Sequence, residues 1–105
     1  IKELYVAANT SLARVILDPD EVHFYVLHPH IINSAFVAAM PLFVEPGFLP
    51  FGINELYYQK QQPIRSCWIT TRLKKQTGHF AIFDAFIYSD EGQLLASLLG
   101  CTIKK

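Results

Sequence analysis

Asn33 is the polar side chain best placed to do chemistry in this sequence, because it lies within an apolar run typical of a buried helix. A carboxamide donates and accepts hydrogen bonds but has no proton to give up near neutral pH. Asn33 can therefore position a substrate group or a water, and it cannot serve as a general acid. The alternative is a structural role, in which the side chain caps backbone groups at the start of the helix.

Three histidines, His23, His28 and His30, precede Asn33 in the sequence. His28 and His30 form an HxH pair, but no further ligand follows at helical or strand spacing, so we expect no metal site. We interpret His28 as a hydrogen-bonding residue at the helix start rather than as a base. The sequence contains no GxSxG motif, glycine-rich phosphate loop or Cys/His nucleophile pair.

Several other chemically capable side chains lie in segments that resemble strands. Asp84 stands close to two phenylalanines, and bracing of a strand or hairpin is the favoured role for its carboxylate. Cys67 and Cys101 lack CxxC spacing, which predicts two reduced, half-buried thiols and a cytoplasmic setting. The aromatic residues Trp68, Tyr57 and Tyr58 are expected to pack on a sheet.

The helix that carries Asn33 has clear boundaries in the sequence. Pro29 suits the first helical position, where the missing N–H is not needed, and Pro41 is expected to end the helix after Met40. Helical spacing places the apolar residues on two neighbouring stripes, which predicts burial on most sides. One stripe contains Ile32, Phe36 and Met40, and the other contains Ile31, Ala35 and Ala39.

Alternating or β-branched runs on both sides of the helix predict strands. A hairpin should come first, followed by the helix and then by an antiparallel meander with a turn at residues 89–92. One apolar helix flanked by strands predicts an α+β hot-dog fold, a sheet wrapped around one buried helix. The expected strands are residues 1–6, 12–17, 51–59, 64–73, 80–88 and 93–103.

Composition narrows the classes of function. The 105 residues suffice for one domain, and a net charge of zero gives no electrostatic basis for binding nucleic acid or an anionic membrane. The longest apolar stretch is shorter than the about 18 residues of a membrane helix. With 51% hydrophobic and 17% charged residues, we expect a face covered by a partner. The chain begins at Ile1, and we expect it to be a piece of a longer polypeptide.

The helix segment and two segments of the tail resemble the dehydratase domain of modular type I polyketide synthases. Residues 28–37, HPHIINSAFV, are similar to the family's helix motif HPALLDAALQ. Residues 49–56, LPFGINEL, are similar to its strand LPVSIEEL, and residues 83–96 are similar to its closing hairpin. The resemblance covers nearly the whole chain and implies the C-terminal half of a double hot-dog domain in polyketide (antibiotic) biosynthesis.

The resemblance also implies a site between two halves, with a catalytic His in an HxxxGxxxxP motif on one and an Asp on the helix of the other. Asn33 stands where that Asp is expected, and Val37 where its Gln or His companion is expected. No HxxxGxxxxP motif occurs in the 105 residues. His28 and Pro29 match the family's helix start and, with Val37, are expected to contact the substrate.

These departures predict altered chemistry. Loss of general-acid help is expected to cost dehydration about 10²–10⁴-fold, whereas a double-bond shift needs only removal and return of a proton. In this family, the paired change resembles the members that shift double bonds. We therefore expect an enoyl isomerase without a cofactor, whose substrate is carried on the phosphopantetheine of an acyl carrier protein. A non-catalytic structural half and an ordinary dehydratase half are the alternatives, and a homodimer is also considered.

Overall fold

The computed structural model describes residues 1–17, 29–42, 49–58 and 65–104, although the side chains of residues 29, 30 and 49–51 are not described. Within this part of the chain, one α-helix accompanies a six-stranded sheet. That helix has 11 residues, and no described helix is long and apolar enough to cross a membrane. The elements are β1 (Glu3–Val6), β2 (Thr10–Ile16), α1 (Pro29–Ala39), the 3₁₀ turn η2 (Met40–Leu42), β3 (Leu49–Tyr58), β4 (Ser66–Gln76), β5 (Phe80–Tyr88) and β6 (Leu94–Lys104).

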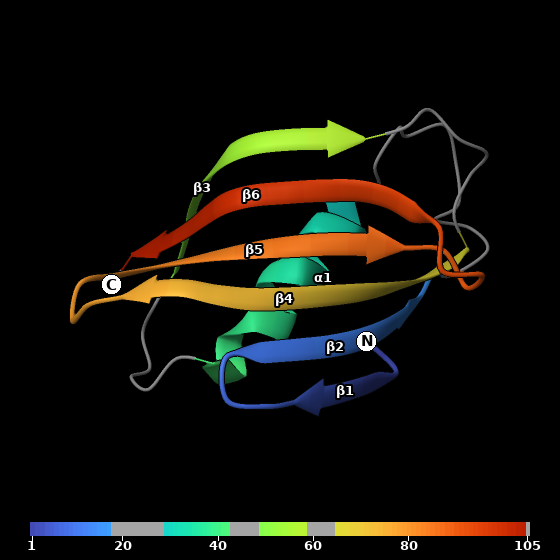
Figure 1. Cartoon of the computed structure of the whole chain (residues 1–105), viewed down its shortest axis with the longest axis horizontal. Helices are drawn as coiled ribbons and strands as arrows, with labels where there is room; N and C mark the ends of the chain where they lie inside the picture. Colours follow the sequence, from blue (N-terminus) through green and yellow to red (C-terminus); the bar gives the residue numbers. More distant parts are fainter. Residues whose placement is uncertain (18–28, 43–48, 59–64, 105) are drawn as a thin grey trace.

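All strand pairings are antiparallel, and the order across the sheet is β1-β2-β4-β5-β6-β3 (Figure 1). The expected meander is confirmed for β4, β5 and β6. It is wrong for β3, which pairs with β6 and forms the edge opposite β1. The reason is that β2 pairs with β4 along its length and occupies the position that the meander assigned to β3. The strand after the helix therefore finds its partner on the far side of the sheet.

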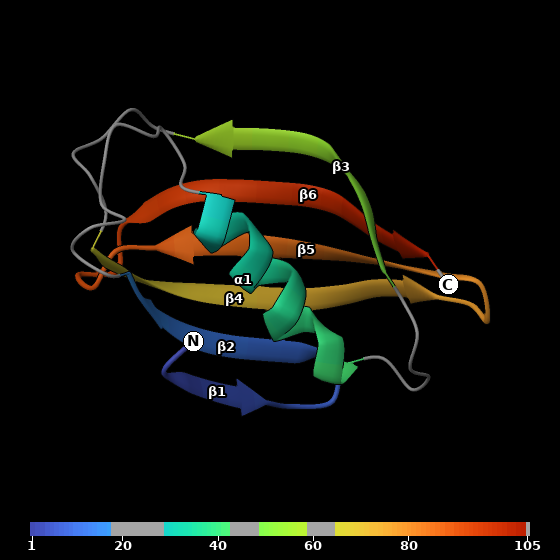
Figure 2. The same ribbon diagram turned by 180° about the vertical axis from the view of Figure 1, so that it is seen from behind.

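The helix covers one face of the sheet, called the inner face below. Figure 2 shows α1 crossing this face obliquely; its backbone lies nearest to β2 and β4, and Phe36 also contacts Phe83 of β5. Pro29 is its first residue, as predicted. Burial alternates along β5, so that Phe83 and every second residue beside it point toward the helix. A core of buried apolar residues fills the space between the two layers.

The prediction for the two helical stripes is partly confirmed. Ile31, Ala35 and Ala39 are fully buried and Phe36 is 6% exposed, but Met40 is 39% exposed. Each step of four residues turns the helix about 40° past a full circle. Two such steps from Ile32 therefore carry Met40 out of the buried sector, and the stripe ends at Phe36.

The two strands that flank β5 each contain an extra residue opposite it. Lys74 is the extra residue of β4, and β6 has two residues, Leu99 and Gly100, opposite Asp84 of β5. Gly100 has a φ of +65°, which favours glycine. We call Lys74, Asp84 and Gly100 the sheet bend. Bulges of this kind increase the twist of a strand and help curve the sheet around the helix.

Candidate functional site

The helix exposes one narrow arc that contains Asn33, Val37 and Met40, and we call these three residues the helix arc. Asn33 is exposed, while Val37 is 44% and Met40 39% exposed. Their spacing of four and seven residues keeps all three within about 60° around the axis. The arc therefore joins one amide to two apolar side chains on a helix that is otherwise largely buried.

Packing on the opposite side of α1 fixes the direction of this arc. The rings of Phe36 and Phe83 meet edge to face, with centroids 5.3 Å apart and planes at 84°. Small side chains at Ser34, Ala35 and Ala38 are buried and let the helix approach the sheet closely. Rotation of the helix about its axis would break these contacts. Asn33 and Val37 are consequently held away from the core.

The position of Asn33 argues against a capping role. An N-cap residue precedes the first helical residue, whereas α1 begins at Pro29 and Asn33 lies in its second turn. Among the described residues, no hydrogen bond engages the Asn33 side chain. Its carbonyl oxygen and amide group are thus available to a ligand or to another part of the protein.

The helix arc can orient a polar group but has no group that titrates near neutral pH. An amide contributes one acceptor and two donor hydrogens, and the side chains of Val37 and Met40 add an apolar surface beside it. A reaction at this arc therefore requires a proton carrier from elsewhere. The arrangement suits an apolar substrate whose single carbonyl group lies near Asn33, either in direct contact or through a water molecule.

The other predicted site residues are only partly described. His28 lies outside the described residues, as does His23. The backbone of Pro29 and His30 belongs to the first turn of α1, which places them on the same helix as Asn33. Within the described part of the chain, no group of three or more His, Cys, Asp or Glu side chains could hold a metal ion.

The two cysteines are free, as predicted, but they are completely buried rather than half-buried. Burial raises the pKa of Cys67 to about 12, with a smaller contribution from the charge of Asp90. Burial, together with Asp84, likewise raises the pKa of Cys101 to about 12. Both thiols are therefore protonated near neutral pH, and neither is an activated nucleophile.

Asp84 performs the bracing role that the sequence favoured. Its Oδ1 accepts a hydrogen bond of 2.9 Å from the backbone N–H of Gly100, and its Oδ2 lies 3.8 Å from Nζ of Lys74. The sequence alone does not indicate the partners of Asp84. A single glycine in a strand-like run is a signal for a bulge that could have identified Gly100.

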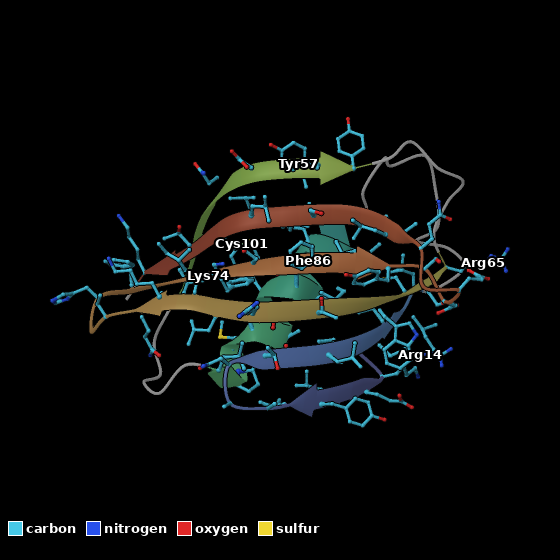
Figure 3. All side chains as sticks on the ribbon, in the orientation of Figure 1. Arg14, Tyr57, Arg65, Lys74, Phe86 and Cys101 are labelled. Carbon is cyan, nitrogen blue, oxygen red and sulfur yellow. The ribbon has the colours of Figure 1, made fainter. Side chains whose placement is uncertain are left out.

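The face of the sheet opposite the helix carries a shallow depression of about 480 Å³ between the β1–β2 hairpin and β4. Figure 3 views this outer face, with Phe86 near its centre and Arg14 toward one edge. The guanidinium of Arg14 lies 5.5 Å from the ring centroid of Trp68, which is half-buried on β4, in agreement with the expectation that it packs on a sheet. Tyr57 and Tyr58 are 58% and 52% exposed on β3, so the expectation that they pack on the sheet is wrong. They lie on an edge strand without a further neighbour in the described sheet.

Comparisons with known proteins give one consistent picture. Residues 1–105 match the family model described as the polyketide synthase dehydratase N-terminal domain. Polyketide synthase PksR of Bacillus subtilis (strain 168) is 31% identical over 113 residues, covering 100% of this chain and 4% of that protein. A solved trans-acyltransferase polyketide synthase enoyl-isomerase is 32% identical, with a TM-score of 0.82 over 96% of this chain and 43% of that chain. The dehydratase domain of RzxB from Pseudomonas fluorescens is 26% identical, with a TM-score of 0.85 over 97% of this chain and 39% of that chain.

These matches confirm the hot-dog fold and correct the expected half. The family model is that of the N-terminal domain, so the assignment to the C-terminal half is wrong by this match. Both halves of a double hot dog consist of one helix and an antiparallel sheet, and the order of elements therefore does not distinguish them. The chain spans less than half of both solved neighbours and 4% of PksR.

Proposed function

The chain belongs to the polyketide synthase dehydratase family, and from this premise we propose that it forms part of a double-bond-shifting domain. The domain would move the double bond of a carrier-bound enoyl thioester from the α,β to the β,γ position. The observation that carries the proposal is Asn33, an exposed amide on the helix arc where the helix motif leads one to expect an acid. The 32% identical solved neighbour is itself described as an enoyl-isomerase.

The proposed reaction needs no proton donor for a leaving group. A base removes a proton from the γ carbon of the α,β-enoyl thioester, and the electron pair becomes part of a dienolate. The same base then returns the proton to the α carbon, which leaves the double bond between β and γ. One histidine can perform both steps, because no bond to oxygen breaks and no water is lost.

Asn33 and Val37 have separate parts in this proposal. The Asn33 amide would hold the thioester carbonyl or a water by hydrogen bonding, and it would thereby stabilise the charge that develops on oxygen. Val37 cannot hydrogen-bond and would line the wall beside the acyl chain. His28 and Pro29, at the start of the same helix, remain predicted substrate contacts.

The base would come from outside this chain, since the HxxxGxxxxP motif does not occur in the 105 residues. We propose a second hot-dog half as the partner that supplies it, in keeping with the larger size of the solved neighbours. The substrate would arrive on the phosphopantetheine of an acyl carrier protein in the cytoplasm, and no further cofactor takes part. Association into a homodimer is compatible with this arrangement.

One observation favours a second candidate, a half-domain with a structural role only. The family match is to the N-terminal domain, while the sequence lacks the histidine motif that the resemblance assigns to one of the halves. If the motif is missing from the whole domain, the helix arc would have no base to work with. The chain would then support the shape of the synthase without catalysis.

The deciding experiment offers the intact domain two thioesters in separate assays in deuterated water. One is a β-hydroxyacyl thioester and the other an enoyl thioester. Deuterium at the α or γ carbon of the enoyl substrate, without water loss from the hydroxyacyl substrate, supports the isomerase. Water loss shows an ordinary dehydratase and overturns the proposal, and no reaction with either substrate favours the structural role.

A further inference from the structure

The helix arc extends further than the two positions that the motif singles out. Met40 is 39% exposed, follows Val37 by one turn, and does not belong to the buried core cluster. The core therefore gives no packing reason for an apolar side chain at this point. On the basis of the proposed function, we infer that Met40 limits the length of the acyl chain that the site accepts.

Helix geometry sets the distances along the arc. With a rise of about 1.5 Å per residue, Val37 lies about 6 Å and Met40 about 10 Å from Asn33 along the axis. A substrate whose carbonyl is held by Asn33 would place its first carbons beside Val37 and more distant carbons beside Met40. α1 ends at Ala39, and the 3₁₀ turn begins at Met40, so Met40 stands at the end of this wall.

The apolar side chains of the helix arc favour contact with one part of a carrier-bound substrate, the acyl chain. The phosphopantetheine arm contains amides and a phosphate, which need polar partners. Val37 and Met40 offer none, whereas His28 and His30 lie in sequence at the opposite end of the helix. The acyl chain should therefore run from Asn33 toward Met40, with the polar arm toward the helix start.

Methionine is suited to such a boundary. Its side chain is unbranched, flexible and polarisable, so it can adapt to chains of slightly different length. Its size still blocks a longer chain unless the side chain moves. Shortening Met40 should open the end of the wall, and enlarging it with an aromatic ring should close the wall earlier.

The main competing occupant of the arc is the packing surface of another part of the domain. In that case Met40 would stabilise an interface, and its truncation would lower the stability of the intact domain. The acyl-length preference would then stay unchanged. These two outcomes are separable by experiment, because one is measured with substrate and the other by unfolding.

The test uses the intact domain with Met40→Ala, Met40→Phe and a control, Ile16→Ala. Ile16 is 44% exposed and belongs to β2, where it points away from the helix-covered face. Saturated acyl-pantetheine thioesters that lengthen two carbons at a time are titrated by calorimetry, and deuterium exchange is followed with matching enoyl thioesters. Relative to the shortest substrate, Met40→Ala should improve binding and kcat/KM for the longest about tenfold. Met40→Phe should do the reverse, and Ile16→Ala should leave the profile unchanged.

An unchanged length profile in both Met40 variants overturns the inference, as does loss of stability without a change in profile. Absence of saturable binding by the parent domain also overturns it. The two proposals fail differently. Loss of the isomerase proposal appears as absent exchange with the binding profile still dependent on Met40, whereas loss of the Met40 inference appears as normal exchange with an unaltered profile.

Discussion

The helix arc and the sheet bend use closely related side chains in opposite ways. Asp84 of the bend is a carboxylate whose side chain is only 17% exposed, and it accepts a hydrogen bond from Gly100. Asn33 of the arc is an exposed amide with no hydrogen-bond partner among the described residues. The carboxylate is thus engaged by the fold, while the amide remains available.

The two polar side chains therefore have different roles, one in stability and the other in chemistry. The partly buried backbone N–H of Gly100 would lose its side-chain acceptor without Asp84, and leaving such a donor unpaired costs free energy of folding. No comparable requirement of the fold acts on Asn33. We therefore expect changes at the bend to alter stability and changes at the arc to alter chemistry.

Restoring the acid at the arc should have the largest effect. Asn33→Asp together with Val37→Gln supplies a titratable group and a hydrogen-bonding companion, so dehydration of a β-hydroxyacyl thioester should rise at least about 10²-fold above the parent. Product formation by the intact domain is followed by mass spectrometry. Asn33→Asp alone is the matched control and should gain less. A folded double variant with no gain would show that a proton donor is not what the arc lacks.

Adding a methyl group at the bend should destabilise the domain without touching the arc. Gly100→Ala forces a side chain into a φ of +65° and places its Cβ 2.7 Å from Cβ of Asn54. The expected loss is about 3 kcal/mol in the free energy of unfolding, measured with urea. Adding Asn54→Gly should recover part of this loss by removing the contact, and full recovery would show that the backbone conformation carries no cost.

Truncation to alanine should affect stability at the sheet bend and activity at the helix arc. Asp84→Ala leaves the Gly100 N–H without its side-chain acceptor and should cost about 2 kcal/mol of stability. Asn33→Ala should leave the urea midpoint nearly unchanged and abolish deuterium exchange. Lys74→Ala should cost under about 1 kcal/mol, because Lys74 is 53% exposed and its ion pair is screened by solvent. Equal stability losses for Asp84→Ala and Asn33→Ala would contradict the proposed division.

The buried thiols provide a pH-dependent test of the packing between the inner face and the helix. Folding raises the pKa of Cys67 and Cys101 from 9.0 to about 12. Their contribution to stability is therefore complete below about pH 9 and is lost as the pH rises toward 12. Urea unfolding across this range should show a decline that is smaller in the Cys67→Ala, Cys101→Ala double variant. An identical decline in both proteins would show that these thiols do not titrate differently on folding.

The order of elements and the family could be predicted from local patterns. The start of the helix at Pro29, the strand Phe80–Tyr88 and the turn before Leu94 all follow from periodicity and turn residues. The same patterns placed β3 beside β4, because adjacency in sequence is the only guide when strands are equally apolar. Pairing of β2 with β4 decides this point, and it depends on contacts between residues far apart in the chain.

For the candidate site, too, some features follow from the sequence and others only from the tertiary structure. The sequence by itself determined that an amide and a valine stand where the family resemblance expects an acid and its companion, because residue identity sets which protons can move. Only the tertiary structure decided that Asn33, Val37 and Met40 share one exposed arc, since the packing of Phe36 on Phe83 fixes the rotation of the helix. Helical periodicity gives the angles between side chains around the axis, but the contact with the sheet decides which side chains are exposed.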